Sequence, residues 1–134
     1  MSVEGPRSLA RQRALGLLYE SSLKSIPIED VLSSLPARPD PFATQLVREV
    51  ERNAQRIDTL ISEASVDWEL SRMPVVDLAV LRLATAELMS RPETPVAVVI
   101  DEAVELAKQF STEDSGRFVN GVLSTVAAQL RPHS

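Results

Sequence analysis

Apolar residues recur with a helical period along almost the whole chain, and nowhere do they alternate as they would in a half-buried strand. The clearest case is the last apolar segment, which runs through an Asn-Gly pair and contains Phe118, Val119, Val122, Leu123, Val126, Ala127 and Leu130. Asn-Gly is by itself a hairpin signal. A period kept over a dozen residues outweighs a propensity two residues long. The sequence therefore predicts an all-α protein.

The same periodicity predicts where the other helices lie. We expect a first helix over 7–23, a short one over 28–35, one long amphipathic helix over 42–64 and a central helix over 74–89. Three prolines in 36–41 predict a loop. The weakly patterned stretch 62–73 is expected to join two subdomains, 1–66 and 67–134, with Trp68 filling their junction.

Capping residues mark the last two helices. Thr94 is expected as the N-cap of the next helix, with Pro95 in its first position. Ser111 and Asp114 resemble a capping box that opens the final helix. Gly121, inside that helix, costs about 1 kcal/mol against alanine. Since only a missing Cβ lets two backbones come very close, we expect Gly121 to lie at a tight helix–helix contact.

Composition removes several kinds of chemistry. The chain has no cysteine, and its single histidine, His133, is next to the last residue, so disulfides, cysteine-bound metals and a histidine-centred active site are not expected. No nucleophile–base pair, phosphate-binding glycine loop or metal-ligand spacing occurs. No apolar run approaches the roughly 18 residues of a membrane span. We expect a cytoplasmic, non-enzymatic protein that binds no cofactor, metal or membrane.

Charge points to one end of the chain. The net charge is −5, which argues against nucleic-acid binding by the molecule as a whole. Residues 1–19, however, carry Arg7, Arg11 and Arg13 against Glu4, a local charge of +2. With Tyr19 on the same predicted helix, these arginines could hold phosphates and stack a base, or they could be an ordinary solvated helix end. Phe118 could likewise be a stacking platform or part of the core.

Other charged positions leave two interpretations open. Asp77, Arg82 and Glu87 lie on the otherwise apolar central helix, where they are either paired internally or face a partner protein. Asp101 and Glu105, four residues apart, could hold a divalent cation. They could equally form a solvated helix face near a helix N-terminus.

Three stretches together resemble the NusB family of transcription antitermination proteins: ARQRALGLLYE (10–20), WELSRMPVVDLAVLRLATAEL (68–88) and VVIDEAVELAKQFSTEDSGRFVNGVL (98–123). Their order and spacing match from residue 7 to residue 130. The resemblance implies two antiparallel three-helix bundles packed together. It also implies binding of single-stranded boxA RNA in ribosomal-RNA leader transcripts, jointly with the small-subunit ribosomal protein that acts as NusE, which keeps the RNA polymerase elongation complex processive.

The resemblance also assigns residues. By position, RNA contacts fall on Arg7, Arg11 and Tyr19 of the first helix, and on Asp114 and Phe118 of EDSGRF; Arg13 belongs to the same arginine group. Asp77 is the best single position for the protein partner, with Arg82 and Glu87 beside it on the same helix. Ser8 and Leu9 replace arginines that are frequent in the family, which predicts weak RNA binding without the partner.

Two further possibilities belong with this assignment. Family members vary between monomer and homodimer, and a homodimer could bury the same arginine surface. The alternative to an RNA-binding factor is a helical structural or dimerisation module with no RNA role. Charge reversal at Arg7 and Arg11 would leave the function of such a module unchanged.

Overall fold

The computed structural model describes residues 5–133, and this part of the chain contains seven α-helices, one 3-10 turn and no strand. The helices are α1 (Pro6–Lys24), α2 (Ile28–Ser33), α3 (Pro41–Arg52), α4 (Ala54–Ala64), α5 (Val75–Ser90), α6 (Val96–Phe110) and α7 (Glu113–Leu130), with the 3-10 turn η1 at Leu70–Arg72. The all-α prediction is confirmed, and α7 runs unbroken through Asn120 and Gly121.

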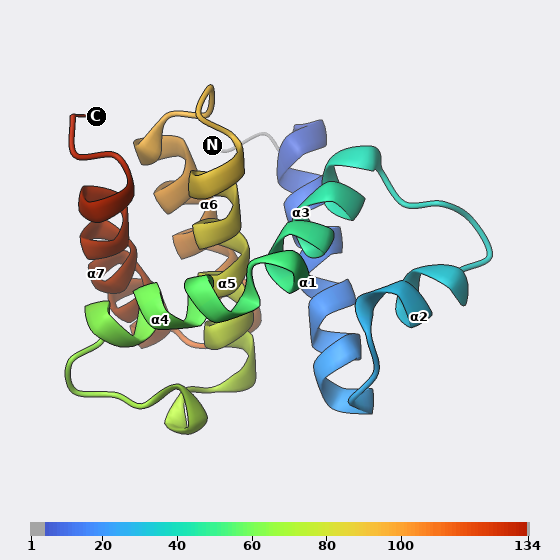
Figure 1. The fold of residues 1–134 in the computed structure, drawn as a ribbon, viewed down its shortest axis with the longest axis horizontal. Coiled ribbons are helices and arrows are strands. Elements are labelled where there is room, and N and C mark those ends of the chain that lie inside the picture. Colours follow the sequence, from blue (N-terminus) through green and yellow to red (C-terminus); the bar gives the residue numbers. More distant parts are fainter. Residues whose placement is uncertain (1–4, 134) are drawn as a thin grey trace.

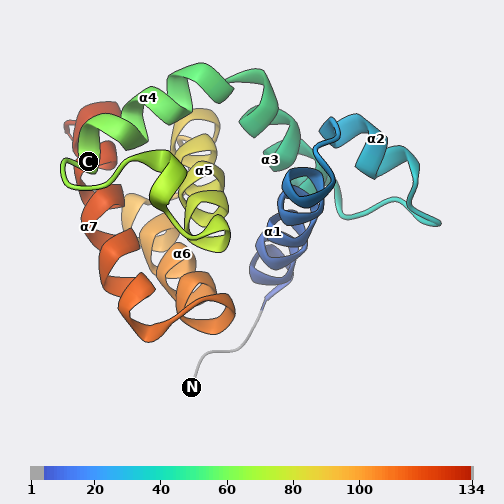
Figure 2. The same ribbon diagram turned by 90° about the horizontal axis from the view of Figure 1, so that it is seen from below.

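The helices form two groups of three (Figure 1). Helices α1, α2 and α3 pack together at the N-terminal end, and α5, α6 and α7 pack together at the other, as the two-bundle prediction requires. Helix α4 lies across α5 and α7 (Figure 2). The groups share one core, because α1 and α3 also pack on α5. The division at residues 66 and 67 stays a prediction.

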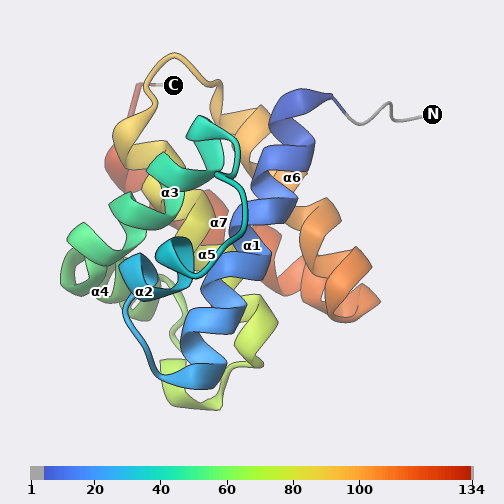
Figure 3. The ribbon, with the colours of Figure 1, turned by 90° about the vertical axis from the view of Figure 1, so that its right-hand side faces the viewer.

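Helix α5 is central because it is apolar nearly all round, and it contacts α1, α3, α4, α6 and α7. Its fully buried residues include Val80, Leu81 and Thr85. In Figure 3, α1 crosses in front of α5 with α2 beside it, so α1 has one face on the core and one face free. That free face is where the candidate site is found.

The stretch predicted as one helix over 42–64 is two helices, and that prediction is wrong. The chain bends at Asn53, which closes α3 and precedes α4 with φ −110° and ψ 23°. Its amide donates to the backbone carbonyl and to the carboxylate of Glu49, the local competition that makes asparagine a poor helix former. The bend turns the apolar stripe from α1 towards α5 and α7 (Figure 2).

Both predicted helix starts are displaced by one residue. Pro95 has an extended ψ of 145° and is itself the N-cap of α6, and the carbonyl of Thr94 accepts from Arg131 instead. The N-cap of α7 is Thr112, whose hydroxyl accepts from the backbone N–H of Ser115. Ser111 ends α6.

Two predictions about packing are also wrong. Trp68 does not fill a junction, because half of its surface is exposed and its ring meets the edge of Phe118 at a centroid distance of 6.2 Å. Gly121 faces solvent, and a Cβ built there meets nothing within 4 Å. The close contact lies at Gly116, where a Cβ would come 2.9 Å from the Cγ of Lys108.

Gly121→Ala is therefore expected to stabilise the protein by roughly 0.5–1 kcal/mol, because alanine restricts the unfolded chain and fits the helical backbone without a clash. Urea unfolding followed by circular dichroism would measure the change. Gly116→Ala is the matched control in the same helix and should gain less, since Lys108 must move. Destabilisation by Gly121→Ala would contradict this account.

Candidate nucleic-acid interface

Arg11 is buried and paired. Its Nε and Nη2 donate to the two carboxylate oxygens of Glu87 on α5, at 2.8 and 2.6 Å. The side chain of Arg11 is 8% exposed and that of Glu87 is 2% exposed. Burial opposes the charged form of Arg11, but the hydrogen bonds and charge of Glu87, helped by Glu102, outweigh it and raise the pKa of Arg11. Arg11 thus joins α1 to α5 and does not present its guanidinium to solvent.

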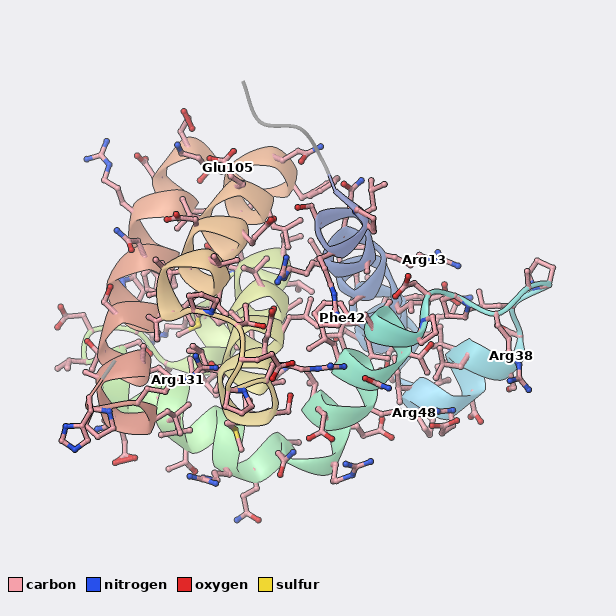
Figure 4. All side chains as sticks on the ribbon, turned by 90° about the horizontal axis from the view of Figure 1, so that it is seen from above. Arg13, Arg38, Phe42, Arg48, Glu105 and Arg131 are labelled. Carbon is pink, nitrogen blue, oxygen red and sulfur yellow. The ribbon has the colours of Figure 1, made fainter. Side chains whose placement is uncertain are left out.

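Arg7 lies on the same side of α1, one turn earlier, and is exposed. Its guanidinium stacks on the ring of Phe42 at 4.0 Å, and Arg91 approaches that ring at 4.9 Å. Figure 4 shows Phe42 at the start of α3, next to α1. Cation–π contacts of this kind hold an arginine in place while its edge stays available. Arg7 is therefore a positioned surface cation.

The opposite, free face of α1 borders an open apolar groove of about 600 Å³. Its walls come from α1, the start of α5 and the end of α6: Leu9, Gln12, Arg13, Leu15, Gly16, Tyr19, Val76 and Phe110. Tyr19 and Phe110 are each about 40% exposed. Arg13 supplies a cation at an apolar, aromatic surface, the combination that binds single-stranded nucleic acid.

A second hollow, of about 270 Å³, lies at the start of α7. It is lined by Trp68, Met73, Pro74, Asp77, Thr112, Asp114, Ser115 and Phe118. Phe118 is half-buried against the core, so both of its predicted roles are compatible with its position. Asp114 is exposed and faces Arg117 one turn on, at 3.9 Å.

The groove and the hollow flank the first turn of α5 and the α6–α7 connection. Val76 lines the groove and Asp77 the hollow, and Phe110 and Thr112 are divided in the same way. Four of the chain's five aromatic residues line these two depressions. The structure thus places Arg13 and Tyr19 in the groove and Asp114 and Phe118 in the hollow, while Arg7 and Arg11 lie on the other side of α1.

The three charges predicted to face a protein partner make internal contacts. Glu87 pairs with Arg11, and Arg82 donates twice to Asp58 on α4 at 2.9 Å. Asp77 is 3% exposed and accepts from Ser115 at 2.9 Å. Of these three, Arg82 keeps the most reachable surface, with 30% of its side chain exposed.

The acidic side chains of α6, which include Asp101 and Glu105, are not arranged as the ligands of a metal ion. Glu102 is held by α1, since it accepts from Ser8 and lies 3.5 Å from Arg11. Within residues 5–133 no three His, Cys, Asp or Glu side chains gather as a metal site would require. In the same range no helix is long and apolar enough to cross a membrane.

Comparison with known proteins identifies the family of this chain. A model of the NusB family matches residues 8–128. The chain belongs to the NusB family. The transcription antitermination protein NusB of Saccharopolyspora erythraea is 48% identical over 129 residues, covering 92% of this chain and 87% of that protein. NusB of Geobacter sulfurreducens is 41% identical over 133 residues, covering 94% and 96%.

Solved structures of NusB proteins share the fold. T. maritima NusB superimposes with a TM-score of 0.84 at 37% identity, over 95% of this chain and 94% of that one. NusB in a crystal structure of the antitermination factors NusB and NusE in complex with dsRNA gives a TM-score of 0.78 at 28% identity, over 92% and 96%.

The geometry adds residues that sequence patterns did not single out for this surface. Trp68, Asp77 and Phe110 line the depressions beside the predicted RNA residues. Asp77 had been expected to face a protein partner, and Phe110 ends a helix whose apolar stripe fits the core. Their places in the walls of the two depressions depend on how neighbouring elements meet, which no spacing rule encodes. For Trp68 and Phe110 the sequence offered one signal: aromatic residues are scarce in this chain, so an aromatic side chain outside the core is unusual.

Proposed function

We propose that this NusB-family chain is a non-enzymatic transcription antitermination factor of the cytoplasm. It binds single-stranded boxA-type RNA of ribosomal-RNA leader transcripts together with the small-subunit ribosomal protein NusE, and so promotes processive transcription by RNA polymerase. The observation that carries the proposal is the pair of aromatic-lined depressions beside Arg13 and Asp114. Family membership over residues 8–128 supports it.

The chemistry of the surface suits a weak, cooperative RNA binder. Exposed aromatic faces stack bases, and few cations are available to neutralise phosphates in a chain of net charge −5. Ser8 and Leu9, where the family resemblance predicts arginine, are a carboxylate-bound hydroxyl and a half-exposed apolar side chain. A second surface shared with NusE would add affinity by joining two weak contacts.

The site residues divide by their surroundings. We propose that four residues contact RNA directly: Arg13, Tyr19, Asp114 and Phe118. Arg7, which stacks on Phe42, adds a further phosphate contact from the other side of α1. Arg11 does not contact RNA but holds α1 against α5 through its bonds to Glu87. On the protein side, we propose that NusE contacts the pair of Arg82 on α5 and Asp58 on α4, whose side chains are each about one-third exposed. A homodimer that covers the groove would compete with RNA.

Arg13→Glu is expected to weaken binding of boxA RNA by roughly tenfold, and to lower the salt slope by about 0.7 for each phosphate that the variant no longer neutralises. Fluorescence anisotropy with labelled boxA RNA, with and without NusE and over a salt series, would measure both effects. Arg56→Glu is the matched control, because Arg56 is exposed on α4 and changes the net charge equally.

Two outcomes would contradict the proposal. One is equal affinity for boxA and a scrambled RNA in both arms. The other is an equal loss for Arg56→Glu and Arg13→Glu, which would indicate non-specific charge attraction. A structural or dimerisation module would give the first outcome. Arg11 is unsuitable for a charge-reversal test, since reversing it disrupts a buried ion pair.

A further inference from the structure

Three guanidinium groups surround the ring of Phe42 at the start of α3. Those of Arg7, Arg91 and Arg11 lie 4.0, 4.9 and 5.4 Å from the ring centroid. Arg11 is neutralised by Glu87 inside the core. Arg7, in contrast, is exposed, and within residues 5–133 it forms no ion pair. Because like charges repel, cations gathered on one ring favour the approach of an anion from solvent.

The cationic surface continues from this ring along the outside of α3. Arg91 keeps 21% of its side chain exposed and donates to the side-chain oxygen of Gln45. Gln45 lines a hollow of about 460 Å³ formed by α2, α3 and the connection between them, and Arg38 and Arg48 line the same hollow. In Figure 4, Arg38 and Arg48 lie beyond Phe42, on its side away from α5, α6 and α7. Arginine side chains therefore extend from the start of α1 to the α2–α3 connection.

Carboxylates balance only part of this surface. Glu29 accepts from Arg48 at 2.6 and 3.2 Å, and this hydrogen bonding lowers the pKa of Glu29, so its carboxyl stays ionised and neutralises Arg48. Glu93 is 3.8 Å from Arg91. Arg38 is exposed and forms no ion pair within residues 5–133. Arg38 is thus a cation at the far end of the surface that an incoming anion can contact.

We propose that this arginine surface binds the backbone phosphates of the RNA segment that adjoins boxA. The inference rests on the proposed RNA-binding function and extends the RNA path beyond the two aromatic-lined depressions. Arg7 joins the two parts, because it is the proposed phosphate contact on this side of α1. The planar guanidinium group of arginine can donate two parallel hydrogen bonds to one phosphate.

The lining of the hollow indicates how the segment is held. None of the described residues that line it is aromatic, so bases have no ring there on which to stack. Contacts to phosphate carry no sequence information. The surface is therefore expected to bind the adjoining segment by charge, independently of its sequence.

The test measures binding of the full chain to boxA RNA alone and to boxA RNA extended by a short oligouridine tract at its 5′ or its 3′ end. Fluorescence anisotropy over a salt series gives the affinity and the salt slope. One of the two extensions is expected to raise the wild-type affinity roughly tenfold and to steepen the salt slope by about 0.7 for each added phosphate contact.

Arg38→Glu should abolish the gain from that extension and leave the affinity for unextended boxA unchanged. Arg38 lies on an exposed connection, outside the core, so the variant is expected to fold. Arg56→Glu is the matched control, because Arg56 is exposed on α4 and its reversal changes the net charge equally. Equal losses in the two variants would overturn the inference, since they would indicate attraction by net charge alone.

Glu29→Gln provides a second variant with the opposite effect. It removes the carboxylate that competes for Arg48, so binding of the extended RNA is expected to tighten severalfold while binding of unextended boxA stays the same. A structural defect would not produce such a gain. Glu63→Gln, exposed on α4, is the control for the change in charge.

Two further outcomes separate this inference from the proposed function. Wild-type protein that binds boxA but gains nothing from either extension would overturn the inference alone, and an acidic protein segment would then be the better occupant of the surface. Wild-type protein that does not distinguish boxA from a scrambled RNA would refute the proposed function, and this inference with it.

Discussion

Arg11→Met is expected to lower the free energy of unfolding by about 3–5 kcal/mol, because it leaves the buried carboxylate of Glu87 without its cation. The same change removes the hydrogen bonds that fix α1 to α5 and the 5.4 Å approach of Arg11 to Phe42. Urea unfolding monitored by circular dichroism would measure the destabilisation. Glu87→Gln should cost a similar amount, since it leaves the buried guanidinium uncompensated.

The double variant Arg11→Met/Glu87→Met is the informative control. Removing both charges takes away the desolvation penalty together with the attraction, so the double variant should be more stable than either single variant. Additive losses in the cycle would show that the two side chains act independently. An Arg11→Met protein as stable as wild type would contradict the buried-pair account altogether.

Arg131→Met is expected to lower the free energy of unfolding by about 1.5–3 kcal/mol, the range for losing hydrogen bonds from a charged donor. Arg131 follows the last turn of α7 and donates to the backbone carbonyls of Leu88, Arg91 and Thr94, at distances between 2.5 and 3.2 Å. Figure 4 shows it beside the connection between α5 and α6. These carbonyls lie at and beyond the end of α5, where intrahelical donors run out.

Arg117→Met is the matched control for Arg131. Arg117 lies on α7 itself, but 92% of its side chain is exposed, and its contact with Asp114 is 3.9 Å long, so its removal should change stability by less than about 0.5 kcal/mol. Thermal unfolding of both variants would separate the effects. Equal stability of the two would mean that the carbonyl contacts of Arg131 contribute nothing net.

The Arg11 pair also changes how the arginines of α1 are interpreted. The sequence placed Arg7, Arg11 and Arg13 in one group, because all three lie within the first predicted helix. In the fold, Arg11 faces the core, Arg7 stacks on Phe42, and Arg13 lines the aromatic groove. The RNA surface proposed here therefore depends on Arg13 and on aromatic side chains more than on a cluster of charge.

Apolar periodicity predicted most helices correctly, but it missed the break between α3 and α4, where the side chain of Asn53 bonds to the backbone. The helical run across Asn120 and Gly121 was predictable, since the apolar stripe of α7 extends for several turns on both sides. The bend at Asn53 was not, because the apolar spacing continues across it while only the facing helices change. Apolar spacing also missed the caps at Pro95 and Thr112, each of which lies one residue from the predicted position.

The sequence by itself determined the all-α class, the central place of α5 and the family, because these follow from apolar period and from motifs contiguous along the chain. Only the tertiary structure decided that Arg11 is buried against Glu87, that Gly121 is free, and that Asp77 shares a hollow with Trp68 and Phe118. The reason is physical. A helix's own sequence fixes which side chains share a face, but whether that face meets a charge, solvent or a hollow is set by the neighbouring helix.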